Sequence, residues 1–154
     1  MSEAKKAPGG TVSEGAVKAG DGNNIFKLDE MAGIKTGVAY SSAKGPLIEG
    51  DKTMVGLMRK EKGTGARPHS HPNEQWNYIV KGKLRVNIDG EETIEGPGTL
   101  LFFPANVVHS TVALPEEDVY FLVVKDASHS VQGIPADGQE TGAYFEPGFG
   151  PESG

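Results

Sequence analysis

The sequence predicts an all-β fold in which many short strands form a sandwich or a barrel. Glycine and proline account for 22 and 10 of the 154 residues and interrupt the chain every few positions. Between them lie short runs of β-branched, aromatic and large apolar residues, and no run has the 3.6-residue period of an amphipathic helix. The chain has no cysteine, so disulfides and thiolate sites are excluded, and its length suits one domain with its own core.

The expected strands follow one another along the chain. Residues Lys83–Asp89 alternate polar and apolar side chains, which is the period-two pattern of a half-buried strand. The pair Asp89-Gly90 is a hairpin turn signal and leads into a strand over Glu91–Glu95. Asp118–Lys125 is apolar on both faces and predicts a buried strand. The remaining expected strands cover Ile25–Leu28, Gly37–Ser41, Thr53–Arg59, Gln75–Val80, Thr99–Phe103 and Ser110–Leu114.

The two ends of the chain differ from the middle in composition. Residues 1–24 contain no aromatic side chain, and we expect a flexible or loosely docked arm. Residues 25–125 carry the strand pattern and form the expected barrel. Residues 126–154 are rich in glycine and proline but include Tyr144, Phe145 and Phe149. These aromatics predict a tail that docks on its own barrel, on a second subunit or at the mouth of a pocket.

Charge and hydropathy limit the classes of partner. The chain has 15 basic and 21 acidic residues and a formal charge of −6, which argues against nucleic acid and anionic membranes. No apolar run approaches the roughly 18 residues needed to span a bilayer. The first residues lack the apolar segment of a secretory signal. We therefore expect a cytoplasmic protein whose partner is a small molecule.

Three of the four histidines fall into one pattern that predicts a metal site. His69 and His71 are separated by one residue, so on an extended strand both imidazoles face the same side and can chelate a divalent metal. Gln75 follows across the bend expected at Pro72-Asn73 and can return to that face on the next strand. His109 begins a later strand, which a hairpin layout would bring back across the sheet.

The spacing of these residues resembles the two motifs of the cupin family, whose fold is a small double-stranded β-helix or jelly-roll barrel. The first cupin motif is G-x5-H-x-H-x3-E-x6-G and the second is G-x5-P-x-G-x2-H-x3-N. Here Asn106 replaces the glycine after the proline, and it also tolerates a positive φ. Ala113 replaces the terminal asparagine, and Gln75 stands in the glutamate position. The two motifs read Gly63-TGARP-His69-Ser70-His71-PNE-Gln75-WNYIVK-Gly82 and Gly98-TLLFF-Pro104-Ala105-Asn106-VV-His109-STV-Ala113.

The resemblance implies a mononuclear metal site with one departure. The family's ligand positions correspond to His69, His71, Gln75 and His109, and the metal would be Fe, Mn, Ni, Zn or Cu. A glutamine oxygen can coordinate without bringing charge, so the metal would keep its full charge and act as a stronger Lewis acid. Glu74 is the alternative third ligand, although strand alternation points it away. A degenerate cupin with an empty site is the remaining alternative.

Two polar residues beside the expected ligands are candidates for substrate binding. If the strand extends back through Pro68, Arg67 shares the face of His69 and would offer a guanidinium to a carboxylate or phosphate. The alternative is an arginine at the rim in solvent. Asn77 should face inward, where it would orient substrate or hold the amide of Gln75.

The resemblance leaves three functions open. The first is a redox-neutral isomerase or lyase that uses the metal as a Lewis acid on a small, anionic or sugar-acid substrate, as in cupins of uronate breakdown and cupin hydroxynitrile lyases. The second is an Fe(II)-dependent dioxygenase, and the third is a non-catalytic ligand-binding cupin. The general base stays open between Glu74, a metal hydroxide and the substrate itself. By analogy with other small cupins, and because sheet edges need covering, we also expect a homodimer.

Overall fold

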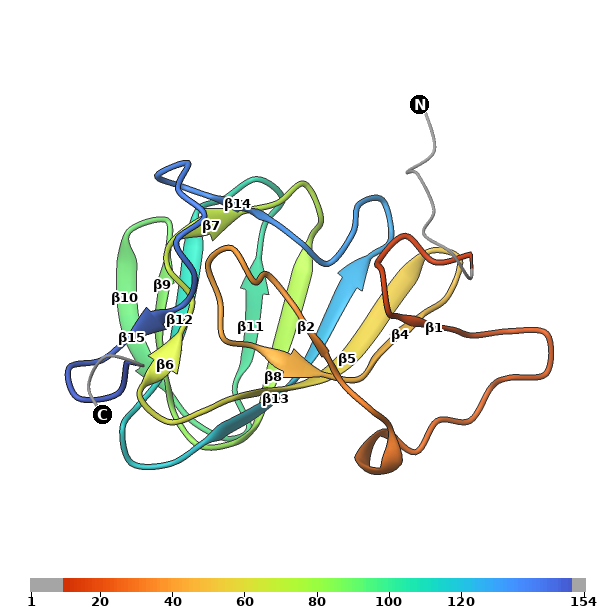
Figure 1. Cartoon of the computed structure of the whole chain (residues 1–154), viewed down its shortest axis with the longest axis horizontal. Helices are drawn as coiled ribbons and strands as arrows, with labels where there is room; N and C mark the ends of the chain where they lie inside the picture. Colours follow the sequence, from red (N-terminus) through yellow and green to blue (C-terminus); the bar gives the residue numbers. More distant parts are fainter. Residues whose placement is uncertain (1–9, 151–154) are drawn as a thin grey trace.

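The protein is built from two β-sheets packed face to face. The computed structural model describes residues 10–150. Within that range the one helical element is the short 3-10 turn η1 (Leu28–Glu30), and no helix there is long and apolar enough to cross a membrane. The two sheets close into a jelly-roll barrel (Figure 1), as the predicted all-β class requires.

The first sheet has eight strands and provides one wall of the barrel. Its main order is β1-β4-β5-β13-β8-β11, and β2 and β3 continue it from β5. Its central strands β5, β13 and β8 lie antiparallel to one another. The bounds are β1 (Val17–Lys18), β2 (Ile34–Lys35), β3 (Lys44–Gly45), β4 (Leu47–Glu49), β5 (Thr53–Lys60), β8 (Gln75–Lys81), β11 (Leu100–Phe103) and β13 (Val119–Asp126).

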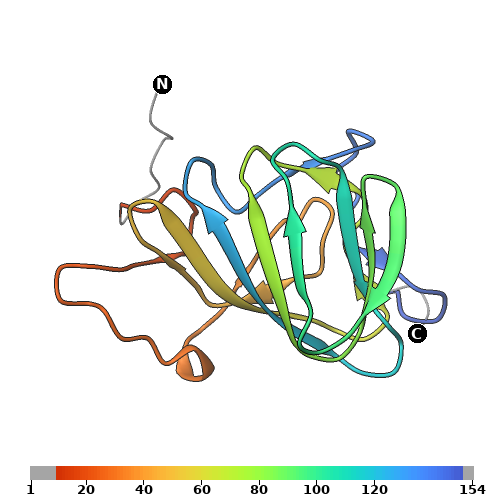
Figure 2. The same ribbon diagram turned by 180° about the vertical axis from the view of Figure 1, so that it is seen from behind.

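The second sheet has seven strands and closes the barrel from the other side (Figure 2). Its order is β10-β9-β12-β6-β15, and β7 joins it between β12 and β14. The bounds are β6 (Thr64–Gly65), β7 (His69–Ser70), β9 (Leu84–Ile88), β10 (Glu91–Glu95), β12 (His109–Ala113), β14 (Ile134–Pro135) and β15 (Tyr144–Phe145).

The core lies between the sheets because the central strands alternate buried and exposed side chains with a period of two. Phe103, Ile79, Leu84 and Val119 are completely buried in it. The seven strands expected from Thr53–Arg59 onward agree with the observed ones to within one residue at each end. These strands were predictable because their sequences are short runs of β-branched, aromatic and apolar residues between turn residues, as strands are when one face packs against a core.

Two expected strands are wrong, and both precede the central barrel. Ile25–Leu28 is irregular and leads into η1, and Ile25 is 84% exposed, so its apolar side chain has no sheet to pack on. Gly37–Ser41 is a turn in which the amides of Tyr40 and Ser41 both donate to the carbonyl of Gly37. Gly37 has a φ of 66°, a conformation in which glycine is favoured and a strand cannot continue.

The described part of the N-terminal arm contacts the barrel through hydrogen bonds. The buried carboxylate of Glu49 accepts hydrogen bonds from the amides of Val12 at 2.5 Å and Ser13 at 3.1 Å. The Ser13 hydroxyl in turn accepts from the amide of Val131 at 2.7 Å. Residues 1–9 of the expected arm lie outside the described residues.

The C-terminal tail docks on its own barrel, which is one of the three arrangements expected for its aromatics. Strands β14 and β15 pair with β7 and β6. Phe149 packs on Gly63, where a Cβ atom would lie 2.3 Å from its Cγ, and Gly63 also has a φ of 71°. The first glycine of the cupin-like motif therefore has two roles. It adopts the positive φ of the turn, and its lack of a side chain leaves room for Phe149 of the tail.

The outer face of the eight-stranded sheet is apolar and exposed. On β8, the outward positions are Trp76, Tyr78 and Val80, which are 43%, 44% and 51% exposed. The neighbouring strand β11 adds Leu100, which is 57% exposed, and Phe102, whose ring lies 4.5 Å from that of Trp76. These side chains form a contiguous exposed apolar face on the outside of the sheet.

Glu49 should decide whether the N-terminal arm stays on the barrel. We expect Glu49→Ala to lower the free energy of unfolding by about 2–4 kcal/mol, because two buried amides lose a charged acceptor. Urea unfolding and limited proteolysis at residues 10–24 would measure both effects. Glu30→Ala, at an exposed position, is the matched control. An unchanged proteolysis pattern would show that the arm is held by other contacts.

Candidate metal centre

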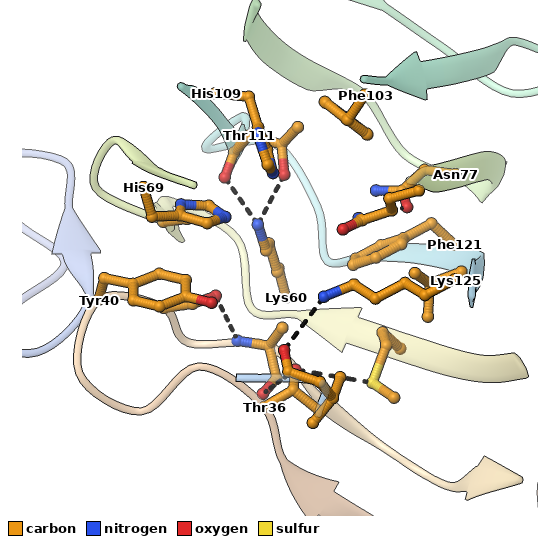
Figure 3. Close-up of a pocket in the computed structure, with 17 residues that line it drawn as sticks. Thr36, Tyr40, Lys60, His69, Asn77, Phe103, His109, Thr111, Phe121 and Lys125 are labelled. Atoms are coloured by element: carbon orange, nitrogen blue, oxygen red, sulfur yellow. Dashed lines mark hydrogen bonds between the residues drawn. The ribbon is translucent and has the colours of Figure 1, made fainter. Parts of the chain in front are cut away.

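Three imidazoles converge inside the barrel. His69 lies on β7, His71 follows it in the next loop, and His109 begins β12 directly opposite His69 in the register of the two strands. All three are buried, and their ligand atoms lie within 4.8 Å of one another. The structure therefore brings together the three histidines that the spacing pattern singled out, and two of them are labelled in Figure 3.

The backbone fixes which ring nitrogen of each histidine faces the centre. The Nδ1 atom of His69 donates to the carbonyl of Arg67 at 2.8 Å, and that of His109 donates to the carbonyl of Val107 at 2.9 Å. His71 Nδ1 donates in the same way to Asn73 at 3.1 Å. A carbonyl can only accept, so Nδ1 carries the proton and Nε2 carries the free lone pair.

The free lone pairs are what a transition metal requires. The Nε2 atoms of His71 and His109 are buried and have no hydrogen-bond partner within the described chain. Burial lowers the pKa of His71 to about 4 and that of His109 to about 3, and it lowers the pKa of His69 well below its ordinary value. The rings are therefore neutral at pH 7, and this donor set fits a divalent metal.

Gln75 stands beside the histidines in an orientation fixed by Asn77. The two side chains are buried on the inner face of β8, and Gln75 Nε2 donates to Asn77 Oδ1 at 2.8 Å. This bond leaves the Gln75 carbonyl oxygen available as a fourth ligand. Of the two roles considered for Asn77, the structure shows the one in which it holds the amide of Gln75. Glu74, the alternative ligand, is exposed.

The turn before His109 has the conformation that the sequence predicted. Asn106 has a φ of 67°, which confirms that it takes the conformation of the glycine it replaces in the motif. Its amide donates to the carbonyl of His71 at 2.8 Å. This bond connects the turn before β12, the strand that begins with His109, to the loop that carries His71.

The expectation that Arg67 points into the barrel is wrong. Its Nη1 pairs with the carboxylate of Asp137 at 2.7 Å, and its other nitrogens donate to the carbonyls of Ala39, Gln139 and Gly142. Arg67 comes two residues before β7, so the strand alternation used for the prediction does not extend to it. Each nitrogen of the guanidinium has a hydrogen-bond partner, in the tail or at Ala39.

Two buried lysines replace Arg67 as the cations of the site, and sequence reasoning missed both. Lys60 ends β5 and Lys125 lies near the end of β13, with exposed fractions of 4% and 6%. Burial lowers the pKa of each to about 7. The signal was present: Lys60 continues the inward positions of Met54 and Met58, but the expected strand stopped one residue short of it.

Tyr40 was also missed as part of the site. Its ring stacks on the His69 imidazole at 4.0 Å with an interplanar angle of 18°. Burial raises the pKa of the Tyr40 hydroxyl to about 12, so it stays protonated. Tyr40 comes from the turn that the sequence pattern assigned to a strand. On the other side, Phe103 packs at 4.4 Å from the ring of His109.

These residues enclose a small cavity of about 50 Å³. Figure 3 shows the lysines entering from different sides, with His69 and His109 across from Asn77. No aspartate or glutamate is among the described residues that line it. The lining consists of Thr36, Tyr40, Ser41, Ala43, Met58, Lys60, Ala66, His69, Gln75, Asn77, Phe103, His109, Thr111, Phe121, Val123, Lys125 and Val131.

The chain is similar in sequence to a known protein family. Residues 56–125 match the family described as Cupin domain. The chain is 36% identical over 78 residues to oxalate decarboxylase OxdC of Bacillus subtilis (strain 168). That match covers 47% of this chain and 20% of the relative, so the chain spans only about a fifth of that protein.

Solved structures agree on the fold. An RmlC-like cupin from Shewanella frigidimarina NCIMB 400 superposes with a TM-score of 0.59 at 22% identity, covering 68% of this chain and 90% of that one. A structure of oxalate decarboxylase superposes with a TM-score of 0.53 at 25% identity, covering 67% of this chain and 29% of that one.

The buried lysines should make stability depend on pH above neutrality. Each lysine has a pKa of about 7 in the folded chain and 10.5 ordinarily, so between these values the unfolded chain binds more protons. The free energy of unfolding should therefore rise with pH in this window, by up to about 1.4 kcal/mol per pH unit for each lysine.

Lys60→Met should flatten this rise and stabilise the metal-free protein at pH 7, because a charge no longer has to be buried. Urea unfolding at several pH values between 7 and 10 would measure both effects. Lys83→Met, at an exposed position, is the matched control and should keep the wild-type slope. Equal slopes for all three proteins would show that Lys60 titrates normally.

Proposed function

Since this chain is a small cupin, we propose that it is a metal-dependent enzyme of the lyase or isomerase type, acting on a small anionic substrate. The observation that carries the proposal is the set of neutral imidazoles whose free Nε2 lone pairs converge in a cavity that also holds two buried lysines. His69, His71, His109 and Gln75 would hold one divalent transition metal, with Fe, Mn, Ni and Zn as the candidates.

The metal would supply Lewis-acid chemistry, polarising a bound oxygen and stabilising the charge that develops on it. The chain's own residues prepare the site. The backbone carbonyls that accept from Nδ1 hold each imidazole in the tautomer that presents Nε2. Asn77 accepts a hydrogen bond from the amide nitrogen of Gln75 and so fixes the rotation of that amide. Phe103 and Tyr40 pack against His109 and His69 and exclude water from them.

The size and charge of the cavity narrow the substrate. A space of about 50 Å³ holds only a few non-hydrogen atoms, since a water molecule takes roughly 10–15 Å³ on this measure. A small carboxylate fits this space better than a sugar acid. The similarity to oxalate decarboxylase over 78 residues supports a carboxylate too, and makes oxalate the first substrate to test.

Metal content and turnover test the proposal together. We expect nearly one divalent metal per chain by plasma mass spectrometry of freshly purified protein. His109→Ala should lose most of this metal and lower turnover by at least about 100-fold, because one of the converging lone pairs is gone. His129→Ala is the matched control, because His129 lies in a loop outside the cluster. Carbon dioxide release from oxalate, with oxygen consumption followed in parallel, measures the reaction.

Other outcomes would replace the proposal with a different function. One iron per chain together with oxygen uptake on a small acid would make the protein a dioxygenase. Absence of metal after anaerobic reconstitution would exclude both the lyase or isomerase and the dioxygenase, and would leave a non-catalytic ligand-binding cupin.

We also propose that two copies of the chain associate through the apolar outer face of the eight-stranded sheet. The face is formed by Trp76, Tyr78, Val80, Leu100 and Phe102, and large exposed aromatic and aliphatic groups are typical of the centre of a stable interface. A second copy covers this face with an identical one, as two-fold symmetry requires.

Light scattering tests this association. Wild-type protein should have twice the chain mass of 16.2 kDa, and Tyr78→Glu should yield the single-chain mass because it buries an unpaired charge at the interface. Ile94→Glu is the matched control, since Ile94 is also exposed but lies on β10 in the other sheet. A wild-type mass of one chain would contradict the proposal.

A further inference from the structure

Among the described residues no carboxylate forms an ion pair with either lysine of the cavity, although at Lys125, whose pKa is lowered by burial, the negative charge of Asp126 acts to raise the pKa. Lys60 and Lys125 are almost fully buried, and neither belongs to an ion pair among the described residues. The carboxylate nearest in sequence, that of Asp126, accepts from the amide of Glu74 and from Ser128. Burying an ammonium group without a partner costs several kcal/mol, so such groups are normally paired.

Both ammonium groups keep donors free. A lysine has three N–H donors. Lys60 Nζ gives two of them to Thr111, at 2.8 Å to the carbonyl and 2.6 Å to the hydroxyl. Lys125 Nζ gives one, to the carbonyl of Val131 at 3.1 Å. The neutral partners place the two nitrogens without satisfying their charge, so each can still donate to a ligand in the cavity.

The strand register separates the two cations. Lys60 lies opposite Val119 in the β5–β13 pair, whereas Lys125 lies opposite Met54 at the other end of the same pair. The side chains therefore approach the cavity from two ends, beside His69 and Asn77 respectively (Figure 3). Two cations that reach the cavity from opposite ends of the strand pair suit a ligand with an anionic group at each end.

We infer that Lys60 and Lys125 form a two-point binding site for a compact dianion, a dicarboxylate of the size of oxalate. The inference rests on the proposed function for its placement beside the metal ligands. The ligand set there is neutral, so the cavity contains no negative charge from the protein to compete with the ligand. The small volume favours a compact ligand, and the two cations favour a dianion over a monocarboxylate.

Binding of oxalate to the metal-free protein tests this site without using enzyme activity. Isothermal titration calorimetry should show one oxalate per chain. Acetate and the uncharged analogue oxamide should bind at least about tenfold more weakly, because each lacks one or both charges. Lys60→Met and Lys125→Met should each weaken oxalate by about tenfold or more. Lys83→Met is the matched control and should bind as the wild type does.

Proton uptake provides a second measurement that a purely structural lysine would not produce. Since the buried lysines have a lowered pKa, oxalate should bring protons with it at pH 8.5, and titrations in buffers of different ionisation enthalpy count them. This measurement uses the wild type, so it stands even if a variant does not fold. Equal binding of oxalate and oxamide, or unchanged affinity in folded lysine variants, would overturn the inference.

The two proposals can fail separately. Lysine-dependent oxalate binding by a chain that holds no metal would support the anion site and contradict the enzyme. A metal-loaded, active enzyme whose metal-free form binds oxalate equally well in the lysine variants would support the enzyme and contradict the anion site.

Discussion

The site depends on one repeated interaction, a hydrogen bond from the Nδ1 atom of each imidazole to a backbone carbonyl two residues away. A side chain held by its own backbone can move only if the backbone moves. The backbone is fixed in turn by the pairing of His109 with His69 and by the bond from the Asn106 amide to His71. Burial then keeps the rings neutral. Barrel closure therefore decides which lone pairs face inward, and a metal would meet a set of donors already oriented.

The neutral Gln75 and the two buried lysines together determine the net charge of the cavity. A glutamate in place of Gln75 would bring a carboxylate beside the histidines, and that carboxylate could neutralise one of the buried lysines. With glutamine there, the protein supplies two cations and no anion. A divalent metal would add to the same excess. The neutral amide of Gln75, held by Asn77, and the ammonium groups of Lys60 and Lys125 are therefore parts of one arrangement, which the proposed anionic ligand would complete.

Much of the barrel and the histidine cluster could be predicted from the sequence because both follow a local rule. Strand alternation gives the face of each residue, and the spacing of His69 and His71 places them together. Prediction failed where tertiary contacts decide. Arg67 lies before its strand begins, and its direction is set by tail carbonyls far along the chain. Tyr40 sits in a turn with no period. Lys60 was predictable by alternation, but a lysine at a strand end is ordinarily exposed, and composition gives no sign that it is buried.

The position of Arg67 gives the C-terminal tail a role in the shape of the site. Its guanidinium binds the tail through Asp137 and the carbonyls of Gln139 and Gly142, and the same group binds the carbonyl of Ala39. Ala39 precedes Tyr40, whose ring stacks on His69. The amide of Arg67 also donates to the carbonyl of Tyr40 at 2.8 Å. A residue first considered for substrate binding thus connects the tail to one face of the metal ligands, so removing the tail would loosen Tyr40 and open His69 to water.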